Sequence, residues 1–141
     1  MGEVIAMRGV KPSEILPGVA PPADALDPPD WLSADARGEW ERVAPILIKE
    51  RQTLTVADIA TFTSYCVAAG QVAEASRIIA ARGMTFQSKT GPKKHPAVSI
   101  RSDAMTQMRL LAGELGLTPV SRSRPALKES GGADGPSLFD M

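Results

Sequence analysis

The stretch from Thr55 to Gly83 carries the clearest helical pattern in the chain and constrains the fold most. A Thr55–Asp58 pair resembling a capping box opens this predicted helix, and Gly83 is typical of a C-terminal end. Gly70 slightly lowers the stability of the helix, and close packing against a neighbouring helix would offset this cost in free energy. Apolar side chains recur in two rows at helical spacing: Ile59, Phe62, Cys66, Ala69 and Ala73 in one, and Val72, Ala75 and Ile79 in the other.

Two further helices are predicted on either side of this one. The first spans residues 34–50, with Ser33 as its cap and Pro45 expected to kink or split it. Its apolar stripe is formed by Trp40, Val43, Ala44 and Leu47. Another helix begins at Pro96, and its expected buried face consists of Val98, Met105, Met108, Leu111 and Leu115, with Ala104 and Ala112 beside it.

The links between the predicted helices carry strand and turn signals. Residues 84–87 alternate like a short strand, and 88–92 have turn chemistry, so a short exposed hairpin or loop is expected over 84–95. Gly116 is placed to adopt a left-handed conformation after the third helix. Thr118 and Pro119 then read as the cap and first position of another short helical turn.

These elements indicate an all-α fold: a small helical domain of about three main helices with a short hairpin or loop between helices two and three. The low aromatic content, 4%, favours helices over sheets. The predicted helical domain spans residues 29–125. A proline-rich segment, 1–28, and a C-terminal tail, 126–141, are expected to be flexible and disordered. The helices carry more apolar residues than a lone three-helix bundle hides, which predicts self-association.

Charge is unevenly distributed along a chain with no net charge. Residues 83–124 have a surplus of basic side chains, residues 31–82 are balanced, and the two terminal segments, 1–30 and 125–141, are acidic. A zero net charge gives no global attraction to nucleic acid or membrane, so any such attraction must be local. Cys66 is the single cysteine, so no disulfide framework is possible and a cytosolic setting is natural. No apolar run approaches membrane-spanning length, and no secretory signal is expected.

Six cations in or near this basic segment are candidate DNA contacts: Lys89, Lys93, Lys94, Arg101, Arg122 and Arg124. The three lysines surround Gly91 and could touch phosphates without reading bases, although a solvated turn is the plainer interpretation. Arg122 and Arg124 could instead bind a protein partner, satisfy carbonyls near the end of helix three, or form ion pairs between subunits.

The chain shows no catalytic constellation, and we expect neither a metal nor another cofactor. His95 is the single histidine and lacks neighbours at metal-ligand spacing, so a structural or exposed role is expected. Trp31 and Trp40 are interpreted as core or staple residues. Lys93 and Lys94 do not belong to a phosphate-binding loop, because the first glycine of that motif is missing.

One group of motifs, taken in order, resembles the P27-type family of phage terminase small subunits over roughly residues 28–125. The segments that carry the resemblance are Pro29-x-Trp31-Leu32, Trp40 with Pro45 and Leu47, Leu54-Thr55-x-x-Asp58, Tyr65-Cys66, Gly83, His95-Pro96, and Glu114-Leu115-Gly116-Leu117-Thr118-Pro119-x-Ser121-Arg122. The last is the most specific, and His95-Pro96 departs from the Asn-Pro more usual in such relatives.

The resemblance implies a non-catalytic subunit that binds double-stranded viral DNA as a homo-oligomeric ring. Such a subunit delivers DNA to a large subunit with the ATPase and nuclease sites, in the cytoplasm of the host. Leu138 and Phe139 in the tail could dock on a partner, or the tail could simply be disordered.

Two other functions remain open. A helix-turn-helix regulator would use helices one and two, but Val56, Ala57 and Asp58 are poor base readers for the start of a recognition helix. The second alternative function is a virion-assembly adaptor, which would join proteins without contacting DNA.

Overall fold

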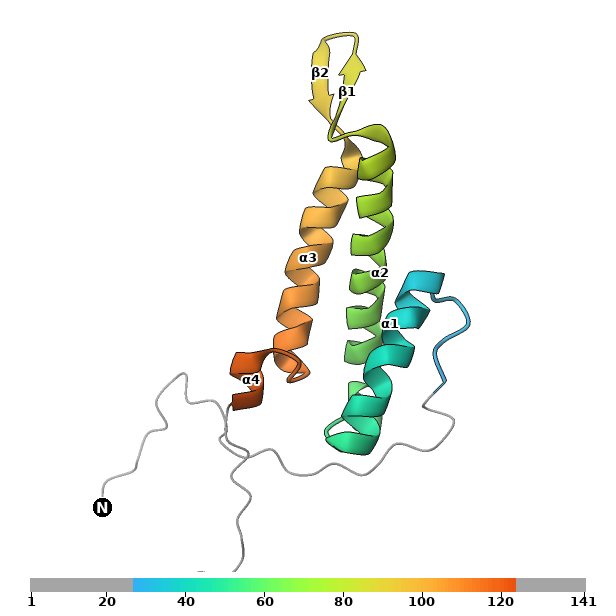
Figure 1. Cartoon of the computed structure of the whole chain (residues 1–141), viewed down its shortest axis with the longest axis vertical. Coiled ribbons are helices and arrows are strands. Elements are labelled where there is room, and N and C mark those ends of the chain that lie inside the picture. Colours follow the sequence, from blue (N-terminus) through green and yellow to red (C-terminus); the bar gives the residue numbers. More distant parts are fainter. Residues whose placement is uncertain (1–26, 124–141) are drawn as a thin grey trace, which may run out of the picture.

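The computed structural model describes residues 27–123, which form a long helical hairpin with a shorter helix against its lower half (Figure 1). The elements in chain order are α1 (Ala34–Pro45), η2 (Ile46–Glu50), η3 (Val56–Asp58), α2 (Ile59–Arg82), β1 (Thr85–Ser88), β2 (Gly91–Lys94), α3 (Pro96–Glu114) and α4 (Pro119–Ser123). The three predicted long helices are therefore present. The all-α label is too narrow, because the predicted hairpin forms a small antiparallel sheet.

The core lies where α1 crosses α2. Ser33 caps α1 by accepting the Ala36 N–H at 3.2 Å, which fixes the start of the helix. Trp40 is buried against Phe62, with ring centroids 4.6 Å apart. Its predicted core role is confirmed. The same prediction is wrong for Trp31, which is 70% exposed, because Leu32 takes the buried position ahead of the cap.

Pro45 changes the type of helix rather than ending it. The segment after it, η2, is a π-helix, in which the Arg51 N–H donates to the Ile46 carbonyl at 2.9 Å. A proline has no N–H to continue the α-helical ladder, so a change of helix type at this point is physically reasonable. Helical structure thus covers the predicted range 34–50, with its last five residues in a wider turn.

Gly70 lies at a close approach between α2 and the start of α1. A Cβ placed on Gly70 would lie 3.0 Å from the Cβ and N of Ala36 and from the Ser33 Oγ. The close packing expected at this glycine is therefore present.

Along the upper hairpin, α2 and α3 meet through small side chains: Ala75, Ala97 and Ala104 are buried. Met105 is 48% exposed, so its predicted burial is wrong. Positions 97, 104, 108, 111 and 115 form the inner seam of α3 at spacings of seven, four, three and four residues, and 105 lies to one side. Lower down, Met108 and Leu111 pack against the core as predicted.

The corner after α3 forms as its sequence predicted. Gly116 has φ 72°, and the Leu117 N–H donates to the Ala112 carbonyl at 2.9 Å, as in a Schellman motif. The Thr118 Oγ1 accepts the Ser121 N–H at 3.1 Å, while the Ser121 Oγ accepts the Thr118 N–H at 3.0 Å. This reciprocal pair caps α4.

Three predictions fall on residues outside the described range of 27–123. These are the flexibility of the predicted segment 1–28 as far as residue 26 and of residues 126–141, a DNA contact by Arg124, and docking by Leu138 and Phe139.

Candidate nucleic-acid interface

The β-hairpin at the tip of the molecule carries three of the candidate cations. Lys89 and Thr90 form its two-residue turn, and Gly91, with φ 115°, begins the returning strand. Lys93 pairs with Phe86 and Lys94 pairs with Thr85. Neighbouring residues of a strand point to opposite faces, so the two lysines lie on opposite faces of the hairpin. All three lysines are exposed, and none has an ion pair within residues 27–123.

His95 joins the hairpin to α3. Its N–H donates to the Met84 carbonyl at 2.8 Å, and its Nδ1 accepts the Ala97 N–H at 3.1 Å. His95 is therefore the cap of α3, which agrees with the structural role expected from the sequence. Its ring stands at 83° to that of Phe86, with centroids 6.3 Å apart.

A pocket of about 380 Å³ opens at the base of the hairpin. Arg82, the last residue of α2, lines it together with Phe86, His95 and Pro96. Phe86 is 43% exposed, so part of its ring is accessible from the pocket. Lys93 lies across the strand pair on the same face as Phe86. Sequence reasoning missed Arg82 and Phe86 because the pocket joins residues from three elements.

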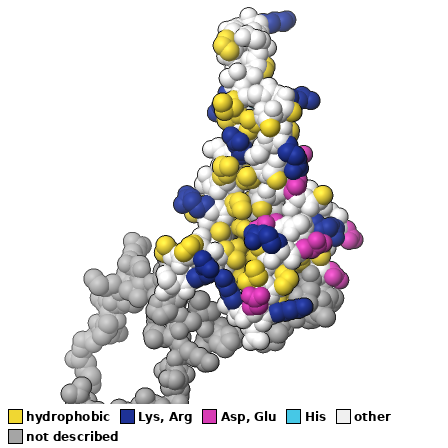
Figure 2. Space-filling view, in the orientation of Figure 1, with side chains coloured by type: hydrophobic (Ala, Val, Ile, Leu, Met, Phe, Trp, Pro, Cys, Tyr) yellow, Lys and Arg dark blue, Asp and Glu magenta, His cyan; other side chains and the backbone are white. Residues whose placement is uncertain are grey.

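The other described candidates do not join this tip. Arg101 lies on α3, below the hairpin, and is partly buried, whereas Arg122 is exposed on α4 at the opposite end of the molecule. Figure 2 shows the dark-blue basic side chains spread from the tip to the lower end rather than gathered in one patch. Of the six candidate DNA contacts, the three lysines therefore lie together on the hairpin, whereas Arg101 and Arg122 lie apart from them.

The carbonyl at the end of α3 is satisfied by a residue that the sequence did not suggest. Arg51 donates from its Nη1 to the Gly116 carbonyl at 2.8 Å, across 65 positions of sequence. One interpretation of the sequence was that Arg122 satisfies carbonyls near the end of helix three. At Gly116 the donor is Arg51 instead. No local signal marks Arg51, since the contact depends on how η2 and α3 come together.

Two acidic side chains of α1, Asp35 and Glu39, bind partners on α1 and α2. Glu39 accepts hydrogen bonds from Arg42 and from the Tyr65 hydroxyl, the latter at 2.6 Å. Burial would raise the pKa of Glu39, but these hydrogen bonds outweigh it and leave that pKa lowered. Asp35 forms an ion pair with Arg77, whose hydrogen bond lowers the pKa of Asp35.

The buried core next to these acids shifts two further groups. Burial, followed by the hydrogen bond to Glu39, raises the pKa of the Tyr65 hydroxyl above its ordinary range. Burial also raises the pKa of the Cys66 thiol to about 12, so Cys66 stays a neutral thiol at physiological pH. Its position on the apolar side of α2 confirms the prediction of a small hydrophobic core residue.

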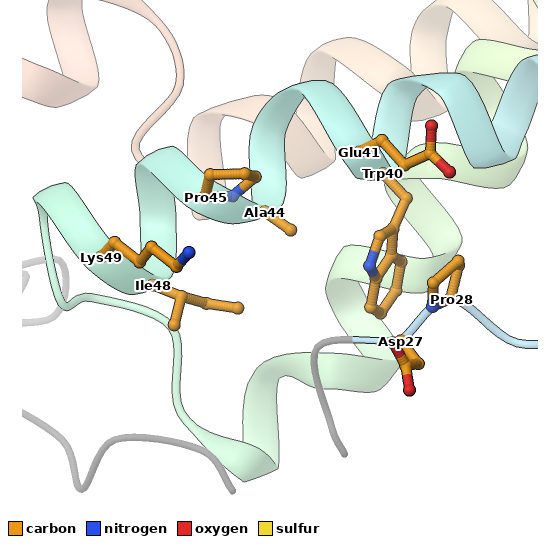
Figure 3. A pocket seen from close by; sticks show the side chains of 8 residues that line it. All are labelled: Asp27, Pro28, Trp40, Glu41, Ala44, Pro45, Ile48 and Lys49. Atoms are coloured by element: carbon orange, nitrogen blue, oxygen red, sulfur yellow. The ribbon is translucent and has the colours of Figure 1, made fainter. Parts of the chain in front are cut away.

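A second pocket, of about 290 Å³, lies beside α1 (Figure 3). Trp40, Ala44 and Ile48 give it apolar walls, and Asp27 and Lys49 are among its charged lining residues. The lining residues come from the segment Asp27–Pro28, from α1 and from η2. They include no group of side chains suited to catalysis. Among residues 27–123, no group of three or more histidine, cysteine or acidic side chains could hold a metal ion.

No described helix is long and apolar enough to cross a membrane. Comparison with protein families gives one match. The family model described as "Phage terminase, small subunit" matches residues 36–131, which is more than half of the chain.

The chain belongs to the phage terminase small-subunit family. The match covers every described helix and strand, including the β-hairpin, except the first two residues of α1. It confirms the family expected from the motifs, while the finer P27-type grouping stays a prediction. A search of curated proteins and a search of solved structures each gave no match. Membership supports a role for this terminase small subunit in phage DNA packaging.

Proposed function

We propose that this terminase small subunit assembles into a homo-oligomeric ring, binds double-stranded viral DNA, and brings it to the large terminase subunit. The family supports the packaging role. The observation that carries the DNA-binding part is the exposed lysine tip without ion-pair partners among the described residues. The chain would act in the host cytoplasm, and the bond-breaking chemistry would belong to the large subunit, so this subunit needs no cofactor.

Self-association is supported by apolar side chains along the helical hairpin. Ile100, Met105 and Leu110 are each about half exposed on α3, and Ile78 is 37% exposed on α2. α1 packs against the lower half of α2, so no other helix lies beside the upper part of the α2–α3 hairpin (Figure 1). Yellow side chains follow this hairpin in Figure 2. Contiguous exposed apolar surface is typical of protein–protein contacts.

Assembly would compensate for the weak attraction of a neutral chain to DNA. One lysine tip offers a few phosphate contacts, which hold a duplex poorly at physiological salt. A ring repeats the tip once per subunit, and linked weak contacts raise the effective affinity strongly. The proposal therefore predicts DNA binding that depends both on assembly and on salt.

Charge reversal at the tip tests the DNA-binding surface. Replacing Lys93 or Lys94 by Glu should weaken duplex binding and flatten the dependence of log affinity on log salt, since each phosphate contact contributes a slope of about 0.9. The measurement is fluorescence anisotropy with a labelled duplex over a series of salt concentrations. Lys49→Glu, at an exposed lysine in η2 far from the tip, is the matched control and should keep the parent slope.

A salt slope unchanged by Lys93→Glu and Lys94→Glu would move the DNA surface away from the hairpin. Absence of salt-dependent binding to any duplex would favour the adaptor function instead. A dimer with tight sequence-specific binding would favour a helix-turn-helix regulator, although η3 begins with Val56 and Ala57, which offer no hydrogen bonds to bases.

A further inference from the structure

We propose that the pocket at the base of the hairpin holds an unpaired nucleobase of the packaged DNA, stacked on Phe86 and flanked by cations that contact the adjoining phosphates. The inference rests on the proposed DNA binding and goes beyond it. It assigns a second mode of contact, directed at single-stranded or locally opened DNA. In this proposal the lysine tip contacts the phosphate backbone of the duplex, and the pocket binds a base that is no longer stacked between its neighbours.

The first argument is the exposed aromatic ring. Phe86 is 43% exposed and lines a pocket of about 380 Å³, a volume in the range of small-molecule sites. The ring of His95 stands nearly perpendicular to it, so the two rings do not stack on each other. Because Phe86 is 43% exposed, part of its ring is accessible to a planar ligand, and nucleobases stack on such rings regardless of sequence.

The second argument is the set of polar groups around this ring. Arg82 lines the same pocket from the end of α2, and Lys93 lies opposite Phe86 on the same hairpin face. The Nδ1 of His95 accepts the Ala97 N–H, so the neutral imidazole carries its proton on Nε2, where it can donate to a ligand. An aromatic platform with donors and cations beside it is the usual arrangement for single-stranded nucleic acid.

The third argument distinguishes an unpaired base from an intact duplex. In a duplex, both faces of a base are covered by its neighbours in the stack, so Phe86 has no base face to contact. A base that stacks on Phe86 must come from a single strand or an opened step, since unstacking is least costly there. The pocket should therefore favour single-stranded DNA without changing duplex affinity.

The test compares single-stranded and duplex binding in the full chain. An oligothymidylate of about 16 nucleotides, the upper end of a usual single-strand footprint, and a duplex of equal length serve as probes. Phe86→Leu keeps an apolar side chain but removes the ring, and Met84→Leu is the control at an exposed neighbour that does not line the pocket. Phe86→Trp restores an aromatic platform.

Phe86→Leu should weaken binding of the oligothymidylate about 10-fold, which is within the range for one lost base stack. Met84→Leu should change it less than about twofold, and Phe86→Trp should retain it. None of the three should alter duplex affinity or the circular dichroism spectrum. This pattern would establish the stacking site, because a loss of fold would affect both DNA forms.

An equal loss on both forms of DNA, or no loss on the single strand, would overturn the proposal. It would also be overturned if a synthetic peptide of residues 125–141 bound in a Phe86-dependent manner while the oligothymidylate did not, since the pocket would then be a peptide site. If the chain bound duplex normally but not the single strand, only this inference would fail. Binding to neither would reject the proposed function as well.

Discussion

Close approach at single residues sets how α1 and α2 pack. Gly70 is the sharpest case, because its missing side chain lets the start of α1 rest directly on α2. The contact also brings Asp35 within reach of Arg77, so one glycine allows both the apolar packing and an ion pair between the two helices. Substitutions here should act through sterics rather than helix propensity.

Gly70→Ala should lower the free energy of unfolding by about 1–3 kcal/mol, because the added methyl would lie 3.0 Å from Ala36 and Ser33. Urea denaturation followed by circular dichroism measures this change. Gly38→Ala is the control within α1, where a Cβ meets nothing within 4 Å. Alanine should stabilise that site by up to about 1 kcal/mol, since it is the better helix former. Equal effects at both positions would contradict the close approach.

Glu39 should make stability depend on pH in the acidic range. Its pKa is lowered from the ordinary value of 4.5 in the folded state, so its contribution is present above pH 4.5 and is lost as pH falls through the folded pKa. The difference in free energy of unfolding between the parent and Glu39→Gln should therefore shrink from about pH 7 to about pH 3. Glu41→Gln, at an exposed site on the same helix, provides the comparison. A difference that stays constant over this range would refute the role of Glu39.

Elements whose signals are local could be predicted from sequence. The cap at Ser33, the hairpin around Gly91 and the corner at Gly116 follow from residue chemistry within a few positions, and all three are present. Contacts between elements that are distant in the sequence could not be predicted in this way. The Arg51 contact with Gly116, the pocket beside Phe86 and the exposure of Trp31 depend on how helices pack, for which the sequence holds no local signal.

The corner between α3 and α4 gives a prediction at the scale of elements. Gly116→Ala should destabilise the fold by about 1–2 kcal/mol, because φ is 72° and a Cβ is strained in the left-handed region. Gly113→Ala, within α3 and with open space around it, should be neutral or mildly stabilising. Thermal unfolding of the two variants side by side would show the contrast, and a neutral Gly116→Ala would exclude the strained corner.

On the scale of the whole molecule, α1 covers the lower half of the α2–α3 hairpin, and no helix lies beside the upper half (Figure 1). Buried large side chains gather at the α1–α2 crossing, whereas the upper hairpin is closed mainly by alanines. Half-exposed apolar residues flank that seam, and the lysine tip extends beyond it (Figure 2). Copies of the chain joined along the hairpin would cover the apolar residues and bring the tips together.

Sedimentation velocity of the full chain over a range of concentrations tests this account most directly. We expect a discrete species several times heavier than the 14.9 kDa subunit, which Ile100→Asp combined with Met105→Asp converts to monomer while Val56→Asp does not. A single species of 14.9 kDa at every concentration, still able to bind duplex DNA, would contradict the account.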